Sequence, residues 1–120
     1  MRLAALMFLA SAWACAQTWS GYLVDSRCYR SLEGNRNPRD TLTEVDHDRG
    51  WEVRYCHLTP KTRSFTVVQK DGQSFELDSA GNAQAAKLFA KAGSKGPFYV
   101  MVTGEMSRNT VRVESIAAAK

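Results

Sequence analysis

The sequence predicts a mainly β protein with one helix, folded as a single domain. Three observations carry this prediction. Segments that alternate apolar and polar side chains recur in the second half of the chain, as expected for strands with one buried face. An Asp71-Gly72 pair separates two such segments, and an alanine-rich stretch follows them. The length of 120 residues fits one domain and excludes a multidomain enzyme.

The chain begins with the features of an export signal. Arg2 precedes an uncharged apolar run, and a small-x-small site ends at Ala16. These features are typical of a secretory signal peptide, and the run is shorter than the roughly 20 residues that a membrane span needs. We therefore expect residues 1–16 to be a signal peptide that is cleaved after Ala16, and residues 17–120 to form the domain.

The same segment allows a second interpretation, in which Cys15 becomes a lipidated N-terminus. Residues 12–15 resemble a bacterial lipoprotein box, but the usual leucine is missing and Trp13 is bulky where a small residue is expected. Cleavage after Ala16 is therefore favoured over a lipid anchor. Both interpretations place the mature chain outside the cytoplasm, in the periplasm or beyond it.

Cleavage after Ala16 would leave two cysteines, Cys28 and Cys56. An even number of cysteines in an exported domain favours a disulfide. Closing a loop of this length would stabilise the fold by about 3.5 kcal/mol on the chain-entropy estimate. A nucleophilic pair of Cys28 with His57 and a thiolate metal site are the alternatives, and neither has a third partner at a recognisable spacing.

Residues 25–63 differ in composition from the rest of the chain. They are dense in charges, their apolar residues follow no clear period, and residues 34–40 are rich in turn formers. We expect a long, mostly irregular excursion, fixed near its ends by Cys28 and Cys56. Loops of this length in compact domains are either functional or loosely structured, and the sequence leaves both interpretations open for this excursion.

Runs of β-branched and aromatic residues predict the strands. The five predicted strands cover residues 19–24, 64–69, 74–77, 98–106 and 110–116. Gly21 predicts a bulge or bend in the first strand. The Asp71-Gly72 pair predicts a hairpin between the second and third strands. In the third strand, Phe75 and Leu77 should face the core.

One helix is predicted over residues 83–92, capped by Asn82 and ended by Gly93. Its apolar face would comprise Ala85, Leu88, Phe89 and Ala92. The resulting order is three strands, a helix and two strands. A small five-stranded OB-like barrel has this order, with its helix between strands three and four. A split α+β sheet is the alternative, because it would use the same elements.

Several short motifs resemble a family of small exported bacterial proteins of unknown function. The motifs are Trp19-x-Gly21-Tyr22-Leu23-Val24-Asp25-Ser26-x-Cys28, Thr62-x-Ser64-Phe65, Asp71-Gly72, Gly81-Asn82-Ala83, Val102-Thr103-Gly104-Glu105 and Val111-x-Val113-Glu114-Ser115-Ile116. They span most of residues 17–120. The resemblance implies export, an OB-like barrel and a structural role for Cys28 and Cys56. It implies no activity and no cofactor, and the stretch from Arg30 to Arg54 matches no motif of the family.

Candidate metal ligands occur in the acidic stretch around Asp46, His47 and Asp48. Alternating oxygen ligands can hold calcium, but this stretch lacks a third acidic ligand and the glutamate at the twelfth position of a calcium loop. A solvated, salt-bridged loop is therefore favoured, and neither a metal nor another cofactor is expected.

Catalysis has one weak candidate, a triad of Ser26, His57 and Asp25, which any chain of this size could offer by chance. Nucleic-acid binding would use arginines and exposed aromatic rings on an OB-like barrel. Export argues against it, because little nucleic acid is present outside the cytoplasm. The aromatic candidates are Tyr22, Tyr29, Trp51, Tyr55 and Tyr99.

The sequence thus favours an exported, non-enzymatic OB-like binding domain for an oligosaccharide, a peptide or a protein. A small envelope hydrolase or metal-dependent enzyme is the alternative. The expected contact residues are Arg49, Trp51, Arg54 and Tyr55, because Trp, Tyr and Arg are the usual anchors of interfaces. Trp51 could instead cover one end of the barrel as part of the core.

Overall fold

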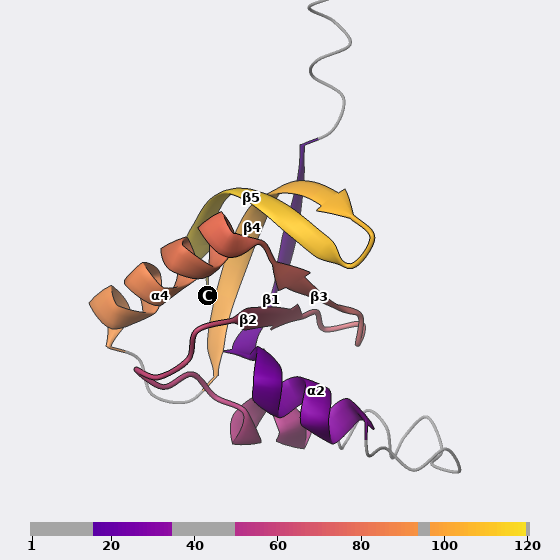
Figure 1. Ribbon diagram of the computed structural model, residues 1–120, viewed down its shortest axis with the longest axis vertical. Coiled ribbons are helices and arrows are strands. Elements are labelled where there is room, and N and C mark those ends of the chain that lie inside the picture. Colours follow the sequence, from indigo (N-terminus) through magenta and orange to yellow (C-terminus); the bar gives the residue numbers. More distant parts are fainter. Residues whose placement is uncertain (1–15, 35–49, 94–96, 120) are drawn as a thin grey trace, which may run out of the picture.

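Five strands and three helices make up the described part of the chain (Figure 1), which a computed structural model gives for residues 16–34, 50–93 and 97–119. In chain order they are β1 (Gln17–Asp25), α2 (Ser26–Gly34), a short helix over residues 50–55, β2 (Phe65–Val68), β3 (Ser74–Leu77), α4 (Ser79–Ala92), β4 (Phe98–Ser107) and β5 (Thr110–Ala118). The predicted mainly β fold is confirmed, and every predicted strand overlaps an observed one. The predicted signal peptide, with Cys15, lies outside the described residues except for Ala16.

The five strands form one mixed sheet whose pairings close into a ring. Their hydrogen-bonded order is β1-β2-β3-β5-β4, and β4 pairs back with β1. The pairs are antiparallel except that β3 and β5 run parallel. Leu23 of β1 lies opposite Val67 of β2 and Phe98 of β4. Each strand therefore has a hydrogen-bonded neighbour on both sides over at least part of its length.

The main core lies inside the ring of strands. Alternate side chains of every strand point inward, as the period of two requires. The buried members are Leu23, Leu58, Phe65, Val67, Phe75, Leu77, Ala85, Phe98, Val100, Val102, Val111 and Val113. Trp19 packs against them, with its ring 5.6 Å from that of Phe75. The prediction that Phe75 and Leu77 face inward is confirmed.

The bulge predicted as one of two possibilities at Gly21, a bulge or a bend, is absent, because β1 pairs with β4 without interruption from Gln17 to Leu23. A glycine is needed here for a different reason. A Cβ at this position would lie 2.7 Å from both the carbonyl oxygen of Val68 and Cγ1 of Val67. Close approach of β2 therefore excludes a side chain. The register shift lies instead in β4, between Thr103 and Gly104.

α4 crosses one side of the sheet and begins earlier than predicted (Figure 1). The N-cap is Asp78, not Asn82, and its Oδ1 accepts hydrogen bonds from the backbone N–H groups of Gly81 at 2.9 Å and Val113 at 3.3 Å. Asn82 lies within the helix, where its Oδ1 accepts a hydrogen bond from the N–H of Phe65 at 3.0 Å. The predicted end is confirmed, since Gly93 caps the C-terminus in the left-handed conformation.

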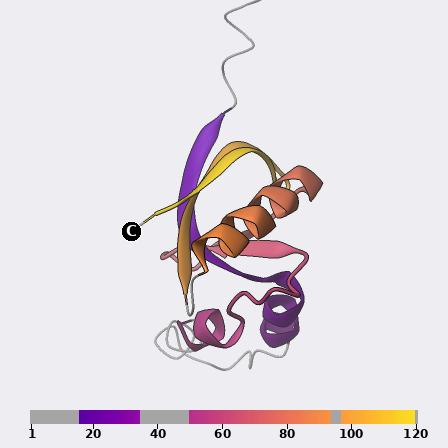
Figure 2. The ribbon, with the colours of Figure 1, turned by 90° about the vertical axis from the view of Figure 1, so that its left-hand side faces the viewer.

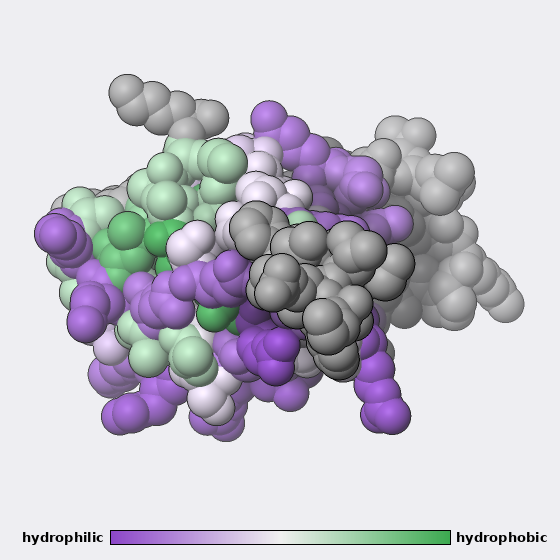
Figure 3. Space-filling view, turned by 90° about the horizontal axis from the view of Figure 1, so that it is seen from above, coloured by the Kyte–Doolittle hydropathy of each residue, from purple (hydrophilic) through white to green (hydrophobic). Residues whose placement is uncertain are grey.

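The predicted apolar face of α4 is confirmed only in part. Ala85 is buried, and Leu88 and Phe89 pack against the main core, but Ala92 is exposed. The ring of Phe89 meets that of Phe98 edge-on, with centroids 6.0 Å apart. Seen from above, hydrophilic side chains dominate the surface, and an apolar area occupies the side on which α4 lies (Figure 3).

The prediction of a mostly irregular excursion is wrong at both of its described ends. α2 follows β1 directly, and the helix over residues 50–55 lies beside α2 at the lower end of the molecule (Figure 2). Both helices pack on the outer face of β1 and β2. The two helices were not predicted because each buries only a few apolar side chains, which give no helical period in the sequence. Together with the strands they form an outer cluster of Val24, Tyr29, Val53, Cys56 and Val68, flanked by Tyr22, Cys28 and Leu32.

The predicted disulfide joins the two helices. Cys28 lies in α2, and Cys56 directly follows the helix over residues 50–55. Their Cα atoms are 5.5 Å apart, and the bond closes a separation of 28 residues. Disulfides of this kind are typical of proteins in oxidising compartments.

Candidate functional site

A pocket of about 400 Å³ opens between the helix over residues 50–55 and the outer face of the sheet. Its walls come from β1, the helix over residues 50–55, the end of β2 with the turn that follows it, and the residue before β4. The lining residues are Tyr22, Gly50, Val53, Arg54, Val68, Gln69, Lys70 and Pro97. A volume of this size matches that of small-ligand sites, which usually measure about 300–1,000 Å³.

The pocket floor is apolar because β1 and β2 carry apolar side chains on both faces. Leu23 and Val67 face the main core, while the next residues along, Val24 and Val68, face outward. Val53 is 6% exposed and Val68 is 1% exposed, so the floor of the pocket consists of side chains that are packed into the outer cluster. The outer cluster therefore continues into the pocket.

One aromatic residue, Tyr22, lines the pocket beside this floor, and Tyr99 packs against it. The rings of Tyr22 in β1 and Tyr99 in β4 meet edge-on, with centroids 5.0 Å apart. Nζ of Lys70 lies 5.1 Å from the centroid of the Tyr99 ring, within the range of a cation–π contact. This contact holds the lysine close to the pocket that it lines.

The charge on the described lining is positive. Arg54 and Lys70 are both exposed and line the pocket, and Gln69 lies beside them. The described lining holds no carboxylate and no histidine. The pocket thus combines an apolar floor with two cations at its mouth.

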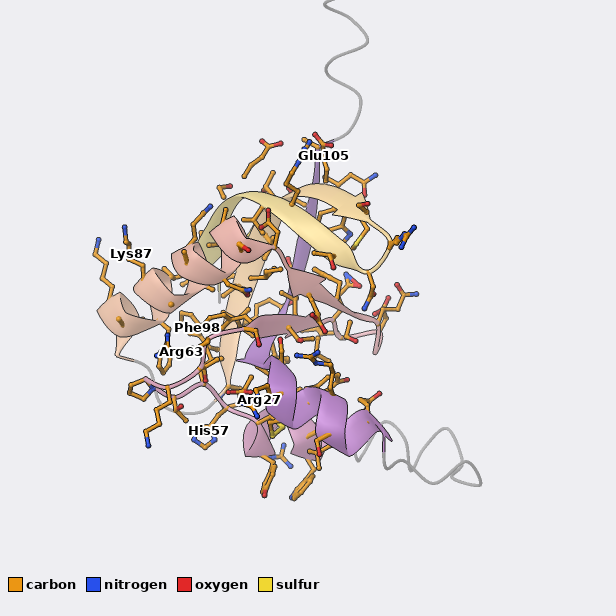
Figure 4. All side chains as sticks on the ribbon, in the orientation of Figure 1. Arg27, His57, Arg63, Lys87, Phe98 and Glu105 are labelled. Atoms are coloured by element: carbon orange, nitrogen blue, oxygen red, sulfur yellow. A yellow bond between two sulfur atoms is a disulfide. The ribbon has the colours of Figure 1, made fainter. Side chains whose placement is uncertain are left out.

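Cations also dominate the described surface of the excursion. Those exposed there are Arg27, Arg30, Arg54, Lys61 and Arg63. Its described acids are more enclosed, since Asp25 and Glu33 are half-buried and Glu52 is 5% exposed. Arg27 and Arg63 lie toward the lower part of the molecule, and Glu105 lies at the opposite end (Figure 4). The described part of the excursion, which supplies Gly50, Val53 and Arg54 to the pocket, thus exposes more cations than carboxylates.

The structure places the predicted contact residues in two different settings. Arg54 lines the pocket. Trp51 and Tyr55 are 46% and 59% exposed, and their rings stack on each other at 4.7 Å with an interplanar angle of 16°. They therefore form a separate exposed pair on the same helix. Arg49 lies outside the described residues.

The residues of the candidate triad take part in separate interactions. Oδ1 of Asp25 accepts hydrogen bonds from the N–H groups of Arg27 and Cys28, which caps α2. The buried hydroxyl of Ser26 lies 2.8 Å from that of Thr66. The exposed ring of His57 has its Nδ1 3.1 Å from the carbonyl oxygen of Arg54. Each contact stabilises the fold locally, and none joins the three side chains.

The candidate metal ligands Asp46, His47 and Asp48 lie outside the described residues. Across residues 16–34, 50–93 and 97–119, no group of three or more His, Cys, Asp or Glu side chains is arranged to hold a metal ion. Within the same ranges, no helix is both long enough and apolar enough to cross a membrane.

Most of the pocket lining was not predicted as a site. The sequence predicts Arg54 as a contact residue and Tyr22 as a base-stacking candidate. No motif marks Val53, Val68, Gln69 or Lys70. One sequence signal marks this region, namely that strands β1 and β2 place apolar side chains on both faces where a surface strand would alternate. The outer face of such a strand must be buried by another element. Here α2 and the helix over residues 50–55 bury it, and the pocket lies at the edge of the second helix.

Comparison of the chain with protein-family models, with curated proteins and with solved structures finds no match.

Proposed function

We propose that this protein is an exported, non-enzymatic OB-like binding domain, and that it binds its ligand in the pocket beside Tyr22. The observation that carries the proposal is the pocket itself, with its apolar floor, the ring of Tyr22 and its polar mouth. Ligand sites in proteins combine these features, since apolar area supplies affinity and a few polar groups fix orientation.

The strand topology supports the OB-like assignment. The ring order β1-β2-β3-β5-β4 and the helix between β3 and β4 agree with a five-stranded barrel of this kind. OB barrels bind ligands on the face of strands 2 and 3 and on the loops that follow strands 1 and 4. The pocket lies where the first of these loops meets β1 and β2.

The excursion alters this common binding face. Arg30 of α2 forms an ion pair of 3.5 Å with Glu76 of β3, and Ser26 contacts Thr66 of β2. α2 therefore occupies surface that other OB barrels offer to ligands. The pocket beside Tyr22 is not filled by α2, and this supports the pocket as the binding site.

Export is supported by two features of the chain. Residues 1–16 have the pattern of a signal peptide. The disulfide between Cys28 and Cys56 is typical of an oxidising compartment. The resemblance to a family of small exported bacterial proteins agrees with both features.

A pocket-filling variant tests the proposed site. A Cβ on Gly50 would meet nothing within 4 Å, so Gly50→Trp should fold and place an indole at the pocket wall. Ala86→Trp adds the same bulk to an exposed position of α4 and is the matched control. The probes are N-acetylated dipeptides, N-acetylated amino acids and neutral trisaccharides, titrated calorimetrically into protein purified from the periplasm.

The proposal predicts that at least one probe class binds, that Gly50→Trp weakens its binding at least tenfold, and that Ala86→Trp leaves it unchanged. Binding that Gly50→Trp does not affect would contradict the proposed site. Failure of every probe class to bind would contradict the proposed function.

A further inference from the structure

We infer that the ligand of this pocket carries a carboxylate on a compact apolar body. The inference rests on the proposed function and deepens it by naming the chemical class of the ligand. It follows from which side chains stand at the mouth of the pocket and which form its floor.

The mouth of the pocket selects for negative charge. Arg54 comes from the helix over residues 50–55 and Lys70 from the turn after β2, so the two cations approach the pocket from separate elements. The described lining offers no carboxylate to neutralise them. A ligand anion would therefore gain attraction from both groups, whereas a ligand cation would be repelled.

Arg54 and Lys70 suit a carboxylate in different ways. A guanidinium presents a planar fork of N–H donors that matches the two oxygens of a carboxylate. An ammonium acts as a compact charge with rotatable donors. The cation–π contact with Tyr99 limits the freedom of Lys70, so less side-chain entropy is lost when an anion binds.

The floor requires an apolar part of the ligand next to the charged one. Val53 and Val68 are buried, and Tyr22 adds a half-buried ring. A hydrated inorganic anion would leave this surface uncovered, and a highly hydroxylated sugar would find few polar partners on it. An aliphatic or aromatic group of about the size of a leucine side chain would cover it.

The exposed cations around the excursion add a long-range contribution. Arg27, Lys61 and Arg63 are exposed on the described part of the excursion, which also supplies the helix that lines the pocket. Clustered charge of one sign raises the local concentration of oppositely charged ligands and speeds their association, and salt screens this effect. Binding of an anionic ligand should therefore weaken as ionic strength rises.

Two sources could supply this chemistry, a free small acid or the C-terminus of a peptide. N-acetyl-leucine and N-acetyl-leucinamide form a matched pair that differs in the carboxylate alone. The tripeptide Ala-Ala-Leu, with a free or an amidated C-terminus, extends the same group into a peptide. Each probe is titrated calorimetrically into the purified protein at low and high salt.

We expect the acid to bind at least tenfold more tightly than its amide at low salt. The variants Arg54→Gln and Lys70→Gln should each weaken binding of the acid about three- to tenfold and weaken binding of the amide by a clearly smaller factor. Lys87→Gln, which removes an exposed cation from α4, is the control and should change neither. Tighter binding of the tripeptide than of N-acetyl-leucine would assign the carboxylate to a peptide terminus, and equal binding would assign it to a small free acid.

The inference is overturned if the amide binds as tightly as the acid. The proposed function would still stand in that case, provided that Gly50→Trp abolishes binding of both. It would also stand if the acid fails to bind while a neutral trisaccharide binds in a manner sensitive to Gly50→Trp. Failure of acids, amides and trisaccharides alike would overturn both the inference and the proposed function.

Discussion

The hydroxyl of Thr62 donates a hydrogen bond of 2.9 Å to Oδ2 of Asp25, across 37 residues of sequence. The other carboxylate oxygen of Asp25 caps α2. The backbone N–H of Asp25 also donates to the carbonyl oxygen of Cys56 at 3.0 Å. One residue at the end of β1 thus holds both ends of the excursion against the sheet.

Removal of this link should destabilise the protein measurably. Asp25→Ala removes the cap and the contact with Thr62, so we expect a loss of about 2 kcal/mol in the free energy of unfolding. Thr62→Val should cost about 1 kcal/mol, since it removes one hydrogen bond. Urea denaturation of both variants and of the double variant measures the coupling between them. Costs that add without coupling would show that the Asp25–Thr62 contact contributes nothing.

The disulfide should be a major source of stability in a domain with so small a core. Replacement of both Cys28 and Cys56 by alanine should lower the free energy of unfolding by about 3.5 kcal/mol, because it frees a long loop in the unfolded chain. Urea denaturation of the double variant, compared with the oxidised protein, measures the change. A loss below about 1 kcal/mol would mean that packing of the two helices, and not the covalent link, holds the excursion in place.

The exposed pair Trp51 and Tyr55 should contribute little to stability. We expect Trp51→Ala and Tyr55→Ala each to cost less than about 1 kcal/mol, because both rings remain in contact with solvent. Val53→Ala on the same helix should cost about 2 kcal/mol, since it empties part of the outer cluster. Thermal denaturation of the three variants tests this order. Unfolding of the Trp51→Ala protein would assign that ring to the core.

Any side chain at position 21 should destabilise the fold. Gly21→Ala would force a Cβ against the carbonyl oxygen of Val68, and we expect a loss of about 1–3 kcal/mol from overpacking. Ser20→Ala changes the half-buried neighbour on the same strand and should cost less than about 1 kcal/mol. Equal effects of the two substitutions would show that β2 can move away from Gly21.

The sequence was sufficient to predict the elements whose pattern is local. Residues 74–77 alternate apolar and polar side chains, and Gly93 is a favourable helix end, so the third strand and the end of α4 were predicted correctly. The cap at Asp78 was missed because Asn82 is an equally good capping residue. Asp78 differs from Asn82 in that its carboxylate also accepts a hydrogen bond from the N–H of Val113. That group is far away in the sequence and comes close only in the folded chain.

The helices of the excursion and the pocket could not be predicted from a local sequence pattern. α2 and the helix over residues 50–55 each bury only a few side chains, and those are anchored by the disulfide and by Asp25 and not by a long apolar stripe. The pocket forms where four distant segments meet, at Tyr22, Val53, Lys70 and Pro97. No local pattern marks such a meeting point, although the two-sided apolar strands β1 and β2 indicate that something covers them.

The most direct test of the account is to locate the bound acid by nuclear magnetic resonance. N-acetyl-leucine is titrated into ¹⁵N-labelled protein, and the amide shifts are followed residue by residue. We expect the largest shifts at Gly50, Arg54, Gln69 and Lys70, around the pocket. Shifts centred instead on the turn at Arg108 and Asn109, or no saturable shifts at all, would contradict the assignment of this pocket as the ligand site.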